Sequence, residues 1–306
     1  MPITSLLAQA GASLNPVSDL DQLTTYPFMV NALEAGTIVA VMAGVIGWFM
    51  VLRKQTFAGH TLSVMAFPGA TGALLIGLSA AAGYFVFSGL AALVIGASAS
   101  GGATRNRGQE SAVTGSVQAF GLACGFLFLS LYHGVLANYE SLLFGSFLGI
   151  TRGQVLTLAV VTVAALALMA LIGRPLLFAS LDEGVARARG VPTRALGLAF
   201  LLTLGLAVAE TAQITGALLV FALLVAPPAT AQLITSRVGA GLLLSVALGV
   251  LTAWLSLALA YFYGYPVGFY VTTVAFTLYV LARIARAAAD RPTRLRVRAR
   301  PAGAGA

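Results

Sequence analysis

The amino-acid sequence predicts an all-α membrane protein, a polytopic bundle of about nine transmembrane helices. Two observations carry this prediction: 59% of the 306 residues are hydrophobic, and only 8% are charged. A soluble domain carries about 25% charged residues, so this chain could not cover a water-facing surface of its size. Its apolar runs are also continuous over about 20 residues, the length of a membrane-spanning helix, whereas a transmembrane barrel needs short alternating strands.

The chain divides into an arm, a membrane domain and a tail. Residues 1–27 form a polar arm that we expect outside the cytoplasm, and residues 28–286 hold the apolar runs. Residues 287–306 are basic and rich in proline and glycine, which predicts a disordered cytoplasmic tail attracted to anionic lipid. An apolar stretch within 133–153 is too short to span and is expected on the outer face. The predicted spans are 30–52, 60–80, 82–103, 112–132, 154–173, 194–211, 214–235, 240–262 and 267–286.

The basic residues predict the orientation in the membrane. An odd number of spans places the two termini on opposite sides. With the N-terminus outside, sixteen of the seventeen Lys and Arg residues fall on the inner side, and only Arg152 lies outside. Cytoplasmic loops of membrane proteins carry this excess of basic residues. We therefore expect a multi-pass protein of the plasma membrane with a cytoplasmic C-terminus. Because the net charge of +8 is distributed in this way, it does not indicate nucleic-acid binding.

The longest inner loop, residues 174–196, reads RPLLFASLDEGVARARGVPTRAL. Asp182 and Glu183 precede basic residues, an order that suits the dipole of a short helix, and Gly190 then ends that helix. The chemistry alone leaves two interpretations open. The loop is either a solvated connector or a helix that docks into a partner and transmits motion.

Six segments, in order along residues 28–286, give the sequence a family resemblance. It resembles the integral membrane subunit of ABC importers for metal ions such as zinc, manganese or iron. Each segment alone is weak, but six in the same order are specific. The segments are FMVNALEAG (28–36), GWFMVLRKQTFAGHTLSVMAFPG (47–69), ESAVTG (110–115), LLFGSFLGIT (142–151), GALLVFALLVAPPATA (216–231) and YFYGYPVG (261–268).

The resemblance implies a permease of the cobalamin and metal-uptake type. Two copies, as a homodimer, would sit on two cytoplasmic ATPase subunits, and an extracytoplasmic metal-binding protein would deliver the ion. The loop 178–192 would then couple the permease to the ATPase, and three prolines would act as gate or kink points. The coupling residues are Asp182, Glu183, Gly184, Arg187 and Gly190, and the prolines are Pro68, Pro227 and Pro228.

The sequence carries no phosphate-binding motif of the G-x-x-x-x-G-K-[ST] type, since its only lysine is Lys54. Any ATP-Mg that drives transport must therefore bind a separate ATPase chain. The sequence also shows no clustered nucleophile and base, which disfavours an intramembrane enzyme. We expect a transporter subunit that is not itself an enzyme and that has no cofactor of its own.

His60 departs from the family pattern. In the family this position is usually Asp, with His four residues later, and such a pair shares one helix face. Here the two positions are His60 and Val64, so one possible metal donor is kept and its neighbour is lost. His60 either contacts the ion in the translocation path or is a locally hydrogen-bonded residue near the water edge.

Two acidic residues lie near the outer ends of predicted spans, Glu34 in the first and Glu210 in the sixth. Ionisable residues within membrane helices are costly, so such residues are functional candidates. With Asn31 and Gln213 nearby, they could form an outer mouth that attracts a divalent cation. The alternative is that these acids are bonded between helices.

These observations favour the permease of an ATP-driven importer for a divalent metal ion, zinc or manganese. It would work by alternating access coupled through residues 178–192. Two rival functions remain open: an ABC permease for a metal chelate, favoured by the missing Asp/His pair, and a proton-driven secondary transporter that uses Glu34 and Glu210 as relays.

Overall fold

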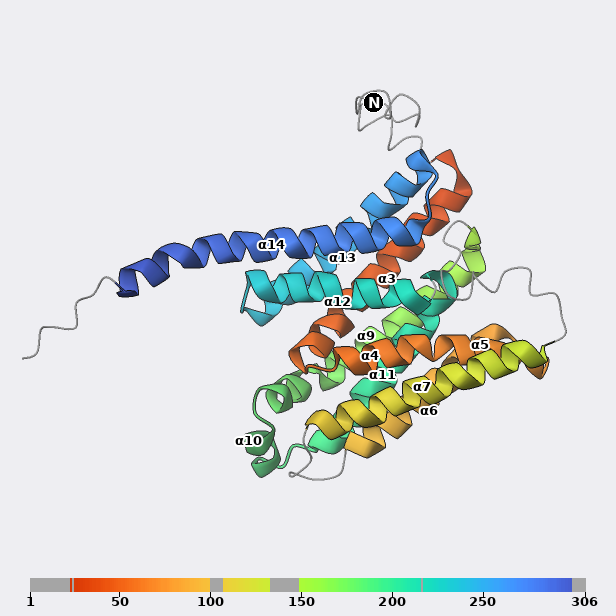
Figure 1. Ribbon diagram of the computed structural model, residues 1–306, viewed down its shortest axis with the longest axis horizontal. Coiled ribbons are helices and arrows are strands. Elements are labelled where there is room, and N and C mark those ends of the chain that lie inside the picture. Colours follow the sequence, from red (N-terminus) through yellow and green to blue (C-terminus); the bar gives the residue numbers. More distant parts are fainter. Residues whose placement is uncertain (1–22, 24, 100–106, 133–148, 216, 299–306) are drawn as a thin grey trace, which may run out of the picture.

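The structure is a computed structural model that describes residues 23, 25–99, 107–132, 149–215 and 217–298 (Figure 1). Within these ranges all regular structure is helical. The helices are α3 (Pro27–Leu52), α4 (Thr56–Val64), α5 (Ala66–Leu75), α6 (Ala80–Ala99), α7 (Arg107–Leu131), α9 (Arg152–Leu181), α10 (Glu183–Ala188), α11 (Thr193–Thr215), α12 (Ala217–Ile234), α13 (Val238–Tyr263) and α14 (Val267–Arg298).

The predicted all-α membrane fold is confirmed. Seven of the described helices are long and apolar enough to cross a membrane on their own, and α12 is a shorter apolar helix. The second predicted span is two short helices, α4 and α5, joined end to end at Met65. The helices therefore agree with the prediction of about nine spans. Of the predicted outer segment 133–153, residues 133–148 lie outside the described part of the chain.

The C-terminal helix is longer than the sequence suggested. The last span was expected to end at residue 286, yet α14 continues to Arg298. Residues 281–289 include five alanines and two arginines, which are strong helix formers, so the helix does not end where the apolar run ends. Residues 287–298, expected as part of a disordered tail, are therefore helical.

Helices α3 and α11 form the centre of the bundle. α3 packs against α13, α12 and α9, and α11 packs against α6, α9 and α12. In both helices 67% of the most apolar window is buried, compared with 11% in α14. Most of the surface of α14 is therefore available to lipid, whereas α3 and α11 are enclosed by protein.

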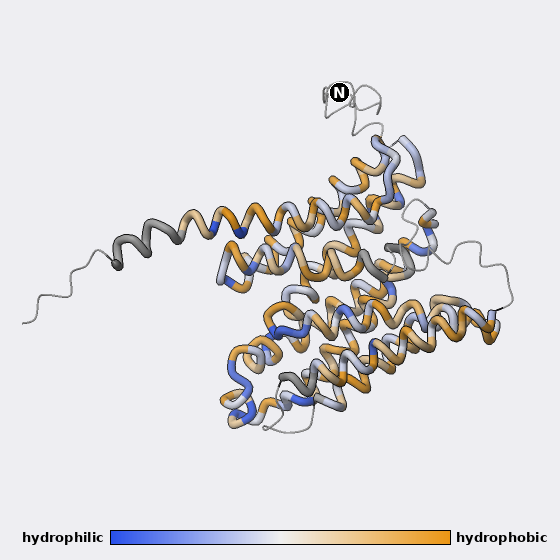
Figure 2. The backbone as a smooth tube through the Cα atoms, viewed as in Figure 1, coloured by the Kyte–Doolittle hydropathy of each residue, from blue (hydrophilic) through white to orange (hydrophobic). Residues whose placement is uncertain are grey.

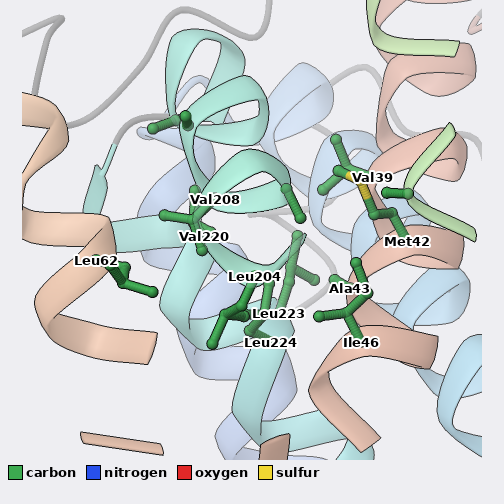
Figure 3. Packing of buried hydrophobic residues seen from close by; sticks show 14 of the residues in the cluster. Val39, Met42, Ala43, Ile46, Leu62, Leu204, Val208, Val220, Leu223 and Leu224 are labelled. Atoms are coloured by element: carbon green, nitrogen blue, oxygen red, sulfur yellow. The ribbon is translucent and has the colours of Figure 1, made fainter. Parts of the chain in front are cut away.

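The hydrophobic core lies where α3, α11 and α12 meet (Figure 3). Its side chains are almost fully shielded from solvent, and α4 adds Leu62 from the side. The core therefore joins α4, the helix that carries His60, to the central helices. The residues labelled in the figure are Val39, Met42, Ala43, Ile46, Leu62, Leu204, Val208, Val220, Leu223 and Leu224.

Glycines allow two helix pairs to approach at backbone distance. A Cβ on Gly83 of α6 would lie only 1.9 Å from the carbonyl oxygen of Gly69 in α5. A Cβ on Gly47 of α3 would lie 2.2 Å from the carbonyl oxygen of Leu224 in α12. Small residues at such crossings are typical of membrane helices, which associate through close packing.

α12 continues through the proline pair Pro227–Pro228, two of the three positions predicted as gate or kink points. Because Pro228 has no amide hydrogen, the carbonyl of Leu224 loses its usual helical donor. That carbonyl faces Gly47 of α3, so protein rather than lipid surrounds it. The helix can therefore continue through the prolines.

The connections between helices gather at two ends of the bundle. α10, the α12–α13 connection and the far end of α14 lie toward the left in Figure 1, and the turn from α13 to α14 lies toward the other end. Hydrophilic residues are concentrated around α10 (Figure 2). The bundle therefore has one polar, arginine-rich end and one end at which α3 and α9 both begin.

Candidate translocation path and coupling helix

His60 lies on α4 and is half-buried. Its ring packs edge-on against the ring of Phe221 in α12, with 4.8 Å between the centroids. The Nδ1 atom is shielded from solvent and has no hydrogen-bond partner among the described residues. Packing against Phe221 therefore holds the ring, and its Nδ1 atom is left without a hydrogen-bond partner among the described residues.

No second metal donor accompanies His60 on its helix face. Val64 occupies the position four residues later and is buried, with 8% of its surface exposed. Within the described residues, no three His, Cys, Asp or Glu side chains come together as a metal site. A stable zinc site needs three or four ligands. His60 in one copy could therefore contribute to the transient passage of an ion, but not to a closed metal site.

Glu34 forms an ion pair with Arg152, the first residue of α9, at 3.2 Å. Asn31 lies on the same face of α3, and its amide donates a hydrogen bond to the carbonyl of Ile150 at 3.1 Å. Both polar side chains therefore hold the start of α9 against α3. In this arrangement Glu34 is bonded between helices rather than unpaired at an outer mouth.

Glu210 lies on α11 and is only 3% exposed. An ionised carboxylate in such a place is costly unless other groups compensate it. Glu210 does have an interaction partner. Gln213 belongs to the same helix, but its side chain lies outside the described part of the structure. Glu210 is therefore not a carboxylate open to water in this arrangement.

The inner loop contains the short helix that its charge order suggested. The Asp182 side chain accepts a hydrogen bond from the Val185 amide at 2.9 Å, which caps the start of α10. Glu183 in the first turn forms an ion pair with Arg187 in the last turn. Gly190 then takes a left-handed conformation with φ of 80°, which ends the helix.

α10 is anchored at its far end as well. The Arg187 guanidinium donates to the Thr193 hydroxyl at 3.3 Å, which links α10 to the start of α11. Ala186 is fully buried, and its carbonyl accepts a hydrogen bond from the Val191 amide. Gly184 lies in the first turn, where a Cβ would meet only the Asp182 carboxylate, at 3.4 Å. α10 therefore has a fixed position between α9 and α11, with its charged side chains exposed.

Arg53, to which the sequence assigned no role, is a contact centre at the same end. Its guanidinium donates to the Ser180 hydroxyl at 3.1 Å and to the Gln55 side chain at 3.0 Å. It also lies over the Phe200 ring, 5.5 Å from the centroid. The basic pair at 53–54 was the only available signal, and it does not distinguish Arg53 from the exposed Lys54.

The fold and the family together define the class of this protein. Residues 25–286 match the ABC 3 transport family, and the chain belongs to that family. It is a non-enzymatic, membrane-spanning permease subunit. This membership confirms the resemblance found in the sequence.

The chain is similar to membrane proteins of two named metal transport systems. The manganese transport system membrane protein MntC of Halalkalibacterium halodurans is 30% identical over 262 residues, which cover 86% of this chain and 88% of that protein. The chelated iron transport system membrane protein YfeC of Yersinia pestis is 30% identical over 249 residues, which cover 81% of this chain and 83% of YfeC.

Solved structures agree with the arrangement of the helices. A chain of PsaBC from Streptococcus pneumoniae, solved in complex with Fab, superposes with a TM-score of 0.76 at 26% identity and covers 87% of this chain and 94% of that one. An inward-facing ABC transporter of the metal-chelate type has a TM-score of 0.68 at 15% identity, which supports the fold alone.

Proposed function

We propose that this chain is the permease subunit of an ATP-driven importer for divalent manganese. The observation that carries the proposal is its 30% identity to a manganese transport protein along 86% of its length. The chemistry of the path is compatible. Manganese accepts carboxylates, carbonyls and water as ligands, whereas zinc is held best by several imidazoles or thiolates. The half-buried His60, without a partner at Val64, suits an ion that is passed on rather than retained.

The transport cycle requires further chains. Two copies of the permease would face each other, so that two His60 side chains could line a shared path. Two ATPase subunits would bind the exposed charges of α10, and an extracytoplasmic binding protein would deliver the ion. In this arrangement α10 lies in the cytoplasm, the N-terminus outside and the C-terminus inside. The excess of arginine at the α10 end supports that orientation.

The role of His60 can be tested in the path itself. His60→Ala removes the imidazole and should lower manganese uptake in membranes that contain equal amounts of protein. The matched control is Val64→Ala, which changes packing on the same helix face without removing a donor. The pair His60→Asp with Val64→His rebuilds an acid and an imidazole on that face and should restore uptake. Normal uptake by His60→Ala would show that His60 does not contact the ion in the path.

The identity of the cargo is tested by uptake and by metal analysis. Cells that lack the gene should take up less radioactive manganese and contain less total manganese, and a plasmid copy should reverse both effects. The similarity to YfeC makes a metal chelate the second candidate. A deletion that lowers only the uptake of chelated iron would favour that candidate. A deletion that lowers only the uptake of zinc would contradict manganese as the cargo.

A further inference from the structure

We propose that Arg53 is a positioning residue that mechanically joins the coupling helix α10 to α4, the helix that carries His60. This inference rests on the proposed function, because it assumes that an ATPase moves α10. It adds a specific route by which such a motion reaches the path. The route consists of contacts made by one guanidinium group with the residue before α4, the last turn of α9 and a ring in the first half of α11.

The first step of the route is the short connection from α3 to α4. Arg53 caps the end of α3, and its amide donates to the Phe49 carbonyl at 2.9 Å. Lys54 then takes a left-handed conformation with φ of 59°, and Gln55 precedes the first residue of α4. The Arg53 guanidinium donates back to the Gln55 side chain. A displacement of Arg53 must therefore displace the start of α4.

The second step connects Arg53 to the entrance of α10. Ser180, which accepts a hydrogen bond from the Arg53 guanidinium, lies in the last turn of α9. Asp182, the residue that caps α10, follows two positions later. Because only one residue separates Ser180 from Asp182, a shift of α10 should also move Ser180.

The third step connects Arg53 to the helix that follows α10. Phe200 of α11 is fully buried and presents its ring to the guanidinium. A Cβ on Gly197 would lie only 3.5 Å from the Nη2 atom of Arg53, so α11 passes close to this group. α11 is also the helix that Arg187 of α10 contacts through Thr193. Arg53 therefore contacts the helices on both sides of α10.

An arginine is suited to this position for a geometric reason. Its planar guanidinium carries five donors in a fixed fork and can stack on an aromatic ring, whereas a lysine ammonium is a point charge. Arg53 is half-buried and uses different nitrogens for Gln55 and Ser180 while its face lies over Phe200. Lysine would keep the charge but could not make these three contacts together.

The experiment measures manganese uptake and ATP hydrolysis in the same proteoliposomes. They contain the permease, its ATPase and its binding protein. For Arg53→Ala, uptake per ATP hydrolysed should fall by about tenfold, within the usual range of coupling between distant sites. ATP hydrolysis itself should stay close to the wild-type rate. Arg53→Lys should give an intermediate ratio, and the control Lys54→Gln should match the wild type.

Three results would overturn the inference. The first is an unchanged ratio of uptake to hydrolysis in both Arg53 variants. The second is a parallel loss of uptake and hydrolysis in both, which would mean that Arg53 only supports assembly. The third is a further tenfold loss when Ser180→Ala is added to Arg53→Ala, because residues on one route should not add. If the wild type itself shows no ATP-driven manganese uptake, the proposed function fails instead.

Discussion

Helices α3 and α9 are joined by an arginine at each of their two ends, but the two junctions differ in kind. At the end where both helices begin, Arg152 pairs with Glu34, and the two side chains are 69% and 41% exposed. At the other end, Arg53 is half-buried and contacts the Ser180 hydroxyl and the Phe200 ring. The first junction joins two charges in contact with solvent, and the second joins one charge to groups fixed by packing.

This difference indicates how the two ends can behave during transport. An exposed ion pair contributes about 0–1 kcal/mol and is weakened by salt, so the Glu34–Arg152 junction, called the outer junction after the proposed orientation, can open at little cost. The inner junction holds a guanidinium in one geometry among several elements, so a movement of one element reaches the others. Under the proposed orientation, the exposed junction would lie where the ion is admitted, and the half-buried junction would lie where α10 transmits a force.

The largest expected effect comes from the coupling helix at the inner end. The double variant Asp182→Asn with Glu183→Gln removes the charged face that an ATPase would bind. Manganese uptake per ATP should fall by about tenfold or more, while insertion into the membrane is preserved. The control is Arg237→Gln, which removes an exposed charge at the start of α13, outside residues 178–192. Uptake at the wild-type level by the double variant would contradict the assignment of α10.

A smaller effect is expected from the backbone that ends α10. Gly190 has a φ of 80°, and a side chain in this left-handed region costs roughly 1–2 kcal/mol. Gly190→Ala should therefore lower the thermal unfolding midpoint in detergent. Gly239→Ala is the matched control, since a Cβ there would have open space and the backbone is not in the left-handed region. Equal midpoints for the two variants would show that the left-handed turn at Gly190 does not contribute to stability.

The outer junction should tolerate substitution better than the inner one. Glu34→Gln is expected to cost less than about 1 kcal/mol of stability, because the ion pair with Arg152 is exposed. Manganese uptake should remain near the wild-type level. Exchanging the charges, with Glu34→Arg and Arg152→Glu together, should restore any loss seen in the single variants. If Glu34→Gln lowered manganese uptake as much as the α10 double variant, both ends would matter equally for transport, which would contradict the difference between them.

The smallest expected effect is a difference between the two junctions in their sensitivity to salt. At about 1 M salt the Debye length is near 3 Å, so an exposed ion pair is largely screened. The difference in thermal midpoint between the wild type and Glu34→Gln should therefore vanish. The corresponding difference for Arg53→Ala should persist, because Gln55, Ser180 and Phe200 are neutral groups that hold the guanidinium in a half-buried place. If both differences persist, the contrast between the junctions is wrong.

The features that the sequence predicted are those set by local order. Continuous apolar runs gave the spans, and Asp182, Glu183 and Gly190 marked the ends of α10 because capping and charge effects act within one turn. The fold class and the family were therefore accessible. The extension of α14 was missed because alanine and arginine continue a helix beyond its apolar part.

The two arginine junctions could not be read from the sequence. Arg53 and Ser180 are 127 positions apart, and Arg152 and Glu34 are 118 positions apart. Their contacts depend on how α3 and α9 are placed by the whole bundle. The sequence could not decide whether Glu34 faces an outer mouth or is bonded between helices, because nothing local indicates that α9 begins beside Glu34 and Asn31. Likewise, Pro227 and Pro228 remain within α12 because α3 covers the carbonyl of Leu224.

We propose that this chain is a conduit that a separate ATPase moves from the α10 end. The most direct measurement is manganese accumulation in proteoliposomes that contain the permease with or without its ATPase and binding protein. We predict accumulation only in the complete complex with ATP. Accumulation by the permease alone, driven by a pH gradient, would contradict the claim and identify a secondary transporter.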